Sequence, residues 1–316
     1  MRYICTYFDS NFLPRGLALY DSLKSNSKNF KLFILALDDE CYNNLINLND
    51  ENIVVISLVD YTQFFGSNQK DKFNNEKEFY FSITPALCIY ILKQYLDIDI
   101  LLYLDADVYL FDDVELIYNE IGSSSIAMCT HRLPWYVRFI SKNYGIYNVG
   151  VNAFRNDQEG NLCLDNWYKN CTEWTANQKN YPLSFFSDQI WLDDWPKMYK
   201  NIKIIDHIGI NTAPWNAQQY TFSVKNGKYF VNNLPLVLYH FSSLKKINSL
   251  EWHGNTSYTI LNISGNLLNI YKEYIQNIIK YEYKIVSSIE LKFNGSKIKM
   301  LVYSFFKKIH NHIIKL

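Results

Sequence analysis

The sequence predicts an α/β protein, built around a mixed sheet with flanking helices and ending in a C-terminal helical appendage. Over the first third of the chain, short apolar runs alternate with segments whose apolar residues recur at three- or four-residue steps. Apolar side chains make up 48% of the 316 residues, which is enough for a large buried core. After about residue 265 the chain becomes basic and keeps a helical pattern. These three observations define the fold class.

Strands and helices alternate in the first half of the chain. The patterns predict strands at 2–7, 31–37, 53–59 and 100–104, and helices near 14–25, 40–48 and 83–96. Connections of this kind make the strands parallel, and ligands of such sheets bind beyond the carboxyl ends of the strands. Asp9, Asp38 and Asp105 follow three of these strands, so we expect them at one crevice. Residues 60–79 are polar and lack periodicity, so we expect an exposed loop there.

The second half is expected to complete one domain, residues 1–246. Its patterns predict strands at 126–130, 148–154 and 236–241, and helices near 158–175 and 186–194. A basic, amphipathic helical extension, residues 247–316, follows. Its end, 285–316, is expected either to bind an anionic membrane surface or to pack on the main domain. The apolar stripe behind that expectation consists of Ile298, Leu301, Val302, Phe305, Ile309, Ile313 and Leu316.

Charge and composition bear on partners and location, and the 48% hydrophobic and 17% aromatic residues exclude a disordered protein. The 31 basic and 31 acidic residues balance, which gives no electrostatic reason to expect a nucleic-acid partner. The six cysteines form no C-x-x-C pair, so we interpret them as reduced thiols in the core. The chain starts directly with a predicted strand and has no apolar run of ~18 residues. We therefore expect a cytoplasmic protein, at most peripheral to the inner face of the cell membrane.

The most informative segment is Asp105-Ala106-Asp107, which follows an apolar strand and precedes further apolar residues. Carboxylates in apolar surroundings lose hydration, so a cation or hydrogen-bond donors must compensate them. Alternation along an extended strand points both carboxylates to the same side. Because carboxylate oxygens bind Mg²⁺ and Mn²⁺, the segment predicts a metal site. The alternative is a helix-starting turn that includes Asp112 and Asp113.

The motifs around this segment occur in an order that resembles the retaining glycosyltransferases of family 8 and their bacterial relatives in lipopolysaccharide synthesis. The resemblance covers roughly residues 2–246. It implies a GT-A (Rossmann-like) fold, Mn²⁺ or Mg²⁺ as the metal, and a UDP-sugar as the donor substrate. By the same resemblance Asp107 is a direct metal ligand, Asp105 contacts metal and ribose, and Ala106 belongs to the nucleotide site.

The family's opening strand and loop resemble Thr6-Tyr7-Phe8-Asp9. This likeness assigns Thr6 and Tyr7 to the nucleotide site, with Tyr7 near the base, and implies that Asp9 accepts a hydrogen bond from uracil N3. A carboxylate matches the imide N–H of uracil and leaves cytosine unmatched. Asp9 also suits the N-cap of the helix expected to begin near Leu13.

Two later motifs are assigned to the donor sugar by the resemblance. Asn148 of Asn148-Val149-Gly150 would touch the sugar, and Gly150 would permit close approach of the backbone. The alternative here is a buried strand with a glycine bulge. Asp188 would bind sugar hydroxyls, and Gln189 would stabilise the oxocarbenium-like transition state with its carbonyl oxygen. Asp188 also suits an ordinary helix N-cap.

The segment that starts at Tyr239 resembles the family's late His-x-x-Gly-x-x-Lys motif. It implies that His240 is the third metal ligand and that Lys245 pairs with the diphosphate. Ser243 replaces the glycine, and His240 and Lys245 are five residues apart where better-known members have six.

Two further segments bear on the substrates. Family members often have an arginine on the helix before the Asp-x-Asp strand, whereas the helix expected near 83–96 has Lys93 as its only cation. Residues 210–216 form a loop-like segment, which either shapes the acceptor side or is simply a packed turn around Trp215.

The sequence therefore predicts a metal-dependent glycosyltransferase of the hexosyltransferase type that retains the anomeric configuration. It would move a sugar from a nucleotide-sugar donor to a saccharide or lipid-linked acceptor. One alternative is a haloacid dehalogenase-type phosphatase, which has Thr or Val where Tyr109 stands. Another is a catalytically silent sugar-binding module, given seven Trp and 26 Tyr.

Overall fold

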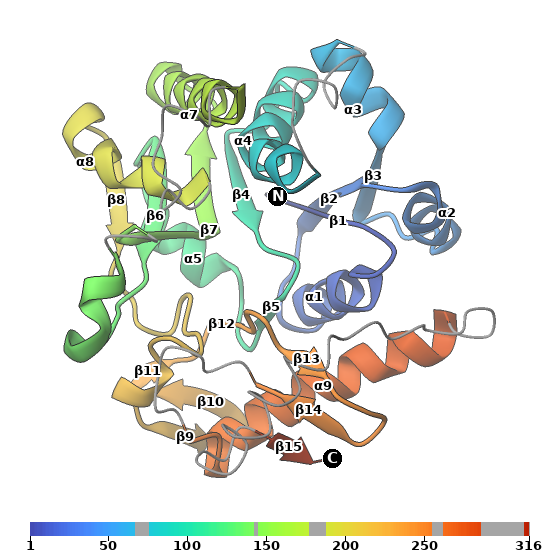
Figure 1. Ribbon diagram of the computed structural model, residues 1–316, viewed down its shortest axis with the longest axis vertical. Helices are drawn as coiled ribbons and strands as arrows, with labels where there is room; N and C mark the ends of the chain where they lie inside the picture. Colours follow the sequence, from blue (N-terminus) through green and yellow to red (C-terminus); the bar gives the residue numbers. More distant parts are fainter. Residues whose placement is uncertain (67–75, 142–144, 177–187, 255–261, 286–312, 316) are drawn as a thin grey trace.

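A seven-stranded mixed sheet forms the centre of the protein (Figure 1). The structure is a computed structural model that describes residues 1–66, 76–141, 145–176, 188–254, 262–285 and 313–315. The strands, in spatial order, are β3 (Ile53–Ser57), β2 (Phe30–Ala36), β1 (Arg2–Phe8), β4 (Ile100–Leu104), β7 (Tyr147–Arg155), β6 (Ile126–Thr130) and β8 (Ile202–Ile205). Within this sheet β7 is antiparallel to both neighbours, and the other neighbouring strands are parallel. The predicted mixed α/β fold class is confirmed.

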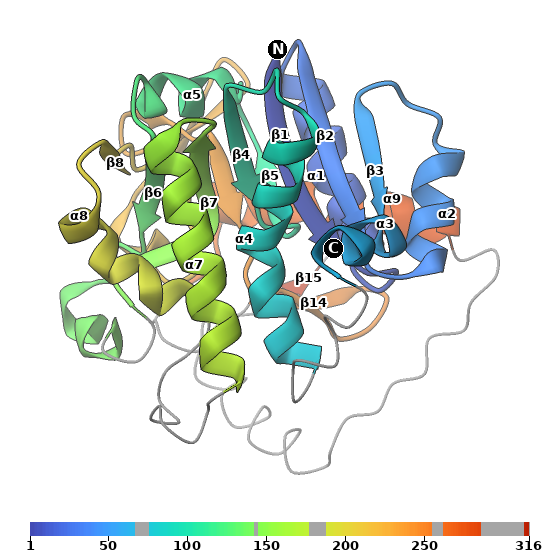
Figure 2. The same ribbon diagram turned by 90° about the horizontal axis from the view of Figure 1, so that it is seen from above.

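Helices cover both faces of the sheet, and each face has its own core. Figure 2 shows α4 and α7 side by side in front of the sheet. The helices on that face are α3 (Leu58–Phe65), α4 (Glu76–Gln94), α7 (Gln158–Ala176) and the 3₁₀ helix η4 (Asp188–Asp194). Those on the opposite face are α1 (Leu13–Asn26), α2 (Asp39–Asn47) and α5 (Glu115–Ile121). Side-chain alternation along the strands supplies both cores: Ile4 and Phe8 of β1 face α1, whereas Cys5 faces α4.

Short strands and α9 (Gly265–Ile285) form a smaller layer, seen at the bottom of Figure 1. Its sheets are β5 (Val108–Leu110) with β12 (Leu238–His240), then β9 (Phe222–Lys225), β10 (Lys228–Val231) and β11 (Leu234–Pro235), and finally β13 (Lys245–Lys246), β14 (Glu251–His253) and β15 (Ile313–Lys315). The remaining short helices are η2 (Trp135–Ile140), α8 (Trp195–Met198) and η5 (Ala217–Gln219). Aromatic side chains join these pieces, and the ring of Phe241 stacks on that of Tyr274 at 4.0 Å. This third core holds β12 in place beside β5.

The expected exposed loop at 60–79 is wrong at both ends. Strand β3 ends at Ser57, whose hydroxyl accepts a hydrogen bond from the backbone N–H of Asp60 and caps α3. Tyr61 of α3 is fully buried against α4, so this helix is held by tertiary packing that the polar composition hid. Helix α4 begins at Glu76, earlier than the expected 83. The middle of the expected loop, 67–75, lies outside the described residues.

The start of the C-terminal extension packs on the main domain. Tyr281 of α9 lies in the same core as α1, and its hydroxyl donates to Asp21. Most of the expected apolar stripe, with the basic segment 286–312, lies outside the described residues. The expected helix is wrong at Ile313, because 313–315 is strand β15, which pairs with β14. Among the described helices, none is long and apolar enough to span a bilayer.

Candidate functional site

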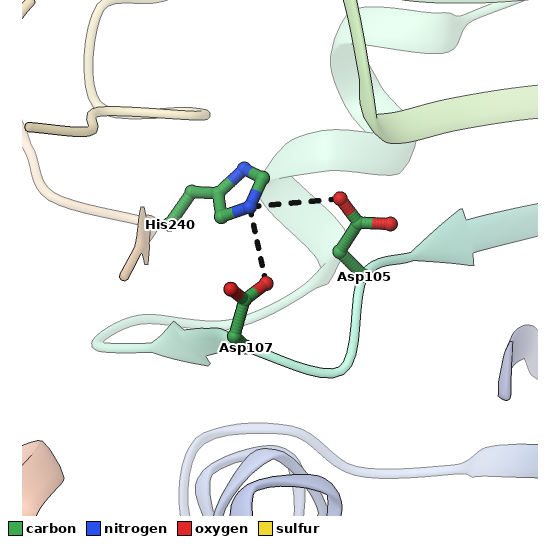
Figure 3. Close-up of side chains that lie close together, drawn as sticks. All are labelled: Asp105, Asp107 and His240. Carbon is green, nitrogen blue, oxygen red and sulfur yellow. Dashed lines mark ion pairs between the residues drawn. The ribbon is translucent and has the colours of Figure 1, made fainter. Parts of the chain in front are cut away.

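Strand pairing brings three predicted metal ligands together. Strand β12 is antiparallel to β5, with His240 directly opposite Val108. The imidazole Nε2 of His240 therefore lies 3.1 Å from Oδ1 of Asp107 and 3.5 Å from Oδ2 of Asp105 (Figure 3). One ligand atom from each residue lies within 4.8 Å of the other two.

The two acids lie in a turn between β4 and β5, not on an extended strand. The N–H of Val108 donates to the carbonyl oxygen of Asp105 at 3.2 Å, which closes the turn. The expectation of an extended strand was wrong, although both carboxylates do face the same partner. The turn is fixed from β7, because the N–H of Asp105 donates to the carbonyl of Gly150 at 3.1 Å.

The three side chains form a half-buried electrostatic cluster. The His240 side chain is 5% exposed, and those of Asp105 and Asp107 are 30% and 19% exposed. Burial and the neighbouring Asp107 raise the pKa of Asp105, against the opposing charge of His240. Burial would also raise the pKa of Asp107, but His240 and then Arg15 outweigh it and lower that pKa. Burial tends to lower the pKa of His240, but the two carboxylates raise it.

This donor set fits a divalent cation. Two carboxylate oxygens and one imidazole nitrogen converge from separate residues, and such mixed oxygen and nitrogen sets suit Mn²⁺ and also Mg²⁺. Neither acid has a Lys or Arg ion pair within the part of the chain that the structure describes, so no fixed side-chain cation replaces the metal.

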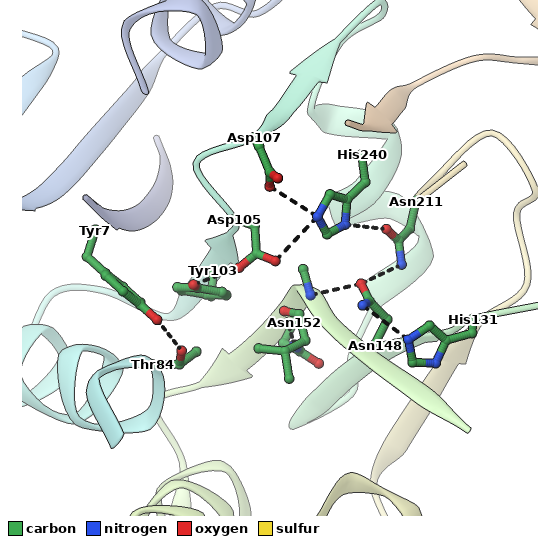
Figure 4. A network of polar contacts seen from close by, with 12 residues as sticks. Tyr7, Thr84, Tyr103, Asp105, Asp107, His131, Asn148, Asn152, Asn211 and His240 are labelled. Carbon is green, nitrogen blue, oxygen red and sulfur yellow. Dashed lines mark hydrogen bonds and ion pairs between the residues drawn. The ribbon is translucent and has the colours of Figure 1, made fainter. Parts of the chain in front are cut away.

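A directional chain of hydrogen bonds orients His240 (Figure 4). Nδ1–H of His240 donates to the amide oxygen of Asn211 at 3.3 Å, and the Asn211 amide N–H donates to Asn148 at 3.1 Å. The Asn148 amide then donates to Nε2 of His131 at 3.4 Å, and Nδ1–H of His131 donates to the carbonyl of Ile146 at 3.2 Å. This arrangement leaves Nε2 of His240 facing the acids, as a metal-binding imidazole requires. We call these four side chains the relay.

Gly150 lies directly against the metal-site imidazole. A Cβ atom built on it would lie 2.6 Å from Cε1 and Nδ1 of His240, closer than any side chain can approach. The pairing of β6 with β7 also shifts register here, so the glycine bulge considered from the sequence is present. Asn148 stabilises the bulge by accepting the Gly150 N–H at 3.0 Å.

Sequence reasoning missed the roles of Asn211 and His131. Asn211 has a φ of +59°, a conformation that Asn tolerates better than most residues, inside the segment 210–216. That segment is a packed turn: Trp215 lies edge-on to both His131 and His240, at 5.4 and 5.1 Å. Arg132 holds the turn from outside by donating to the carbonyl of Asn211 at 2.9 Å. In the sequence, the pairs Asn211-Thr212 and Trp215-Asn216 are only a weak sign that this loop orients a metal ligand.

A cavity of about 260 Å³ opens beside the two acids. Its lining residues are Tyr7, Phe8, Asp9, Phe12, Leu37, Tyr80, Tyr103, Asp105, Ala106 and Asp107. Tyr7 bonds to the hydroxyl of Thr84 at 3.2 Å, and Tyr103 donates to Asp105 at 2.8 Å. The cavity therefore joins the predicted base-binding segment to the predicted metal site.

Residues near the first helix differ in how they relate to this cavity. Thr6 is fully buried on β1 and is not part of the lining. Asp9 lines the cavity and accepts the N–H of Phe12 at 3.0 Å. The alternative role of Asp9 as the N-cap of α1 is wrong, because Phe12 holds the N-cap position and has no side-chain cap bond. Asp38 caps α2 and accepts the N–H of Ser10 at 2.8 Å, which fixes the loop that carries Asp9.

The remaining predicted residues approach the cavity from other elements. Asp188 is the first residue of η4 and is buried. Burial and then the charges of Asp188 and Asp105 raise the pKa of Tyr7, which lines the cavity. The charge of Asp188 is therefore felt at the cavity wall. Gln189 follows it on η4 and is partly buried. Lys245 is exposed on β13, opposite His253 of β14.

Similar sequences share most of the length of this chain. No family model matches it. The uncharacterized protein YfnD of Bacillus subtilis (strain 168) is 23% identical and covers 86% of this chain and 87% of its own. The uncharacterized protein YfnF of the same bacterium is 24% identical, with coverage of 92% and 96%.

Comparison with solved structures identifies the fold. A structure of the galactosyltransferase LgtC, in complex with donor and acceptor sugar analogues, has a TM-score of 0.53 at 12% identity and covers 94% of this chain and 99% of its own. The chain has a GT-A fold. Mouse xyloside xylosyltransferase 1, in its apo form, has a TM-score of 0.51 at 11% identity, with coverage of 77% and 98%. The predicted GT-A architecture is thereby confirmed.

Proposed function

We propose that the chain is a metal-dependent glycosyltransferase. It would transfer a hexose from a UDP-sugar to a saccharide or lipid-linked acceptor, with retention of the anomeric configuration. The main support is the convergence of Asp105, Asp107 and His240 beside a cavity, in a chain whose fold is that of sugar-transferring enzymes. Fold alone does not define an activity, so the proposal rests on this site.

The acids and the imidazole hold the cation in this proposal. A divalent cation bound there supplies positive charge to the diphosphate of the donor as its bond to the sugar breaks. Lys245 pairs with the same diphosphate. The relay through Asn211 keeps Nε2 of His240 unprotonated toward the metal, which is the tautomer that binds it.

The cavity wall is proposed to recognise uridine. Each oxygen of Asp9 accepts one hydrogen bond in the structure, from the N–H of Phe12 and from the amide of Asn11, both at 3.0 Å. A carboxylate oxygen accepts two, so uracil N3–H has an acceptor available. Tyr7 and Ala106 line the nucleotide site, with Tyr7 beside the base, and Thr6 is buried behind this lining on β1.

The sugar is proposed to lie on the η4 side of the metal. Asp188 binds its hydroxyls, and the Gln189 carbonyl oxygen stabilises the oxocarbenium-like transition state. Asn148 and Gly150 form another wall of the same space in this proposal. In the structure they contact His131, Asn211 and His240. The acceptor hydroxyl attacks from the face that the leaving group vacates, and a diphosphate oxygen takes its proton.

A panel of nucleotide sugars tests this function. The full chain is incubated with Mn²⁺ and UDP-, GDP- or CMP-sugars, and release of the free nucleotide is measured. We expect turnover of UDP donors above the others. A preference for GDP or CMP donors contradicts the role of Asp9, and release of phosphate from simple phosphoesters without sugar-nucleotide turnover would favour the phosphatase. Metal-dependent sugar binding without turnover would favour the binding module.

The acceptor and location are tested separately. We propose a cytoplasmic protein that contacts the inner face of the membrane through 285–316 and acts on a lipid-linked saccharide. Replacement of Lys292, Lys297, Lys299, Lys307 and Lys308 by Gln changes no residue of β15. We expect loss of binding to anionic vesicles; unchanged vesicle binding and unchanged activity on a lipid-linked acceptor contradict the membrane proposal.

A further inference from the structure

Besides the metal, the predicted site residues supply one side-chain cation to a diphosphate, Lys245. Helix α4, which precedes the Asp-x-Asp strand, carries no arginine. Three acids, Asp9, Asp105 and Asp107, line the cavity, so an anionic ligand there must be compensated by cations. A cation from another element at the cavity rim would supply this charge.

Arg15, in the first turn of α1, lies at that rim. Its guanidinium carbon is 4.9 Å from the centre of the Phe12 ring, and Phe12 lines the cavity. Its Nη2–H donates to the carbonyl of Leu244 at 3.1 Å, the residue that precedes Lys245. Arg15 thus lies between the cavity wall and the strand that carries the predicted phosphate-binding lysine.

Close packing of α1 fixes this position. A Cβ atom at Gly16 would lie 2.1 Å from the ring of Phe8, so only glycine lets the first turn of α1 rest on β1 at this point. Phe8 itself lines the cavity. The helix therefore presents Arg15 at a fixed place beside the carboxyl end of β1.

The charge of Arg15 is near the metal ligands but is not neutralised. It acts on Asp107, whose ionised form it stabilises. Among the described residues, no carboxylate lies within ion-pair distance of Arg15, and its side chain donates to a neutral carbonyl. A guanidinium has five N–H donors, so most of those of Arg15 remain available to a ligand.

We propose that Arg15 is a substrate-binding residue that holds the diphosphate of the nucleotide sugar, from α1 instead of α4. The inference rests on the proposed function and adds a specific residue to it. The planar fork of Arg15 binds two phosphate oxygens. Its hydrogen bond to the Leu244 carbonyl holds the backbone next to Lys245, the lysine proposed to pair with the same diphosphate. The leaving group is then compensated by side chains from two separate elements in addition to the metal.

Binding of three probes tests the assignment. Affinities of the full chain for UDP, UMP and uridine are measured by calorimetry in Mn²⁺, for the wild type, Arg15→Gln and Arg15→Lys. Arg138→Gln is the matched control, because Arg138 also donates to a backbone carbonyl, that of Leu133, and lies outside the cavity lining. We expect Arg15→Gln to weaken UDP binding about tenfold or more and uridine binding not at all. Arg15→Lys should lie between, since Lys keeps the charge without the fork.

Other outcomes overturn the assignment. If Arg15→Gln leaves UDP affinity unchanged while the wild type binds UDP, the inference fails and the proposed function stands. If UDP and uridine affinity fall equally, Arg15 only supports the Leu244 loop. If the wild type binds none of the three probes, the proposed function fails as well. An effect of Arg138→Gln equal to that of Arg15→Gln also refutes a specific role.

Discussion

The imidazole of His240 packs against the α-carbon of Gly150 with no room for a side chain between them. A Cβ atom at position 150 would lie 2.6 Å from two atoms of the ring. The carbonyl oxygen of Gly150 also accepts a hydrogen bond from the N–H of Asp105, so this one residue of β7 contacts both His240 and Asp105. The glycine predicted to approach a sugar therefore packs against the metal-site histidine.

Gly150→Ala is expected to weaken metal binding. The added methyl group must displace the His240 ring or the β7 bulge, and misplaced ligands typically lose ~10-fold or more in affinity. Mn²⁺ affinity is measured by calorimetry. Gly227→Ala serves as the control for a strained glycine substitution away from the site: nothing lies within 4 Å of its Cβ position, but its φ of +78° strains any side chain. Equal Mn²⁺ affinity in Gly150→Ala and wild type contradicts a role of this packing in metal binding.

Asn211→Gly is expected to reduce Mn²⁺ affinity about tenfold without unfolding the protein. The change removes the acceptor that orients His240, while glycine tolerates the φ of +59°. Asn226→Gly is a matched control, since Asn226 has a φ of +52° in the exposed turn between β9 and β10. If both variants bind Mn²⁺ as the wild type does, the relay has no part in the metal site.

His131 is expected to make stability depend on pH. Burial lowers its pKa to about 4, although its bond to Ile146 acts the other way. The unfolded chain takes up this proton near pH 6.5, so the neutral folded form has its full stability above that value. The free energy of unfolding falls by about 3 kcal/mol as the pH drops from 6.5 to 4, because the unfolded state binds the proton at a higher pH than the folded state does.

Urea unfolding of the wild type and His131→Gln at several pH values measures this contribution. The unfolding free energy of the wild type should fall relative to that of the variant as the pH drops from 6.5 to 4. Subtracting the variant removes the contributions of other titrating groups. A difference that stays constant over this range would show that His131 is not held neutral.

Asp107→Asn is expected to abolish Mn²⁺ binding and with it nucleotide release. Asp112→Asn is the control: its carboxylate pairs with Lys228 at 2.8 Å, away from the cavity. Chelation of metal from the wild type should have the same effect as Asp107→Asn, and added Mn²⁺ should restore activity to the wild type alone. Full turnover in the presence of a chelator contradicts metal dependence.

Local pattern was sufficient for most of the main sheet. Apolar runs such as 100–104 are buried on both faces, and such runs are typical of parallel strands under helices. The pattern failed at α3, because Tyr61 is buried by α4 and not by neighbours in sequence. It failed at β15 for the same reason, since a short strand exists only through its partner.

The sequence by itself determined the α/β class, the positions of the main strands along the chain and the acidic pair at the end of one of them. Only the tertiary structure decided which side chains meet that pair: His240 through the β5–β12 pairing, Asn211 behind it, and Arg15 at the rim. The physical reason is that local sequence patterns and tertiary contacts act over different distances along the chain. Periodicity reports whether a residue is covered, whereas the identity of its neighbour depends on how strands pair and helices pack across the whole chain.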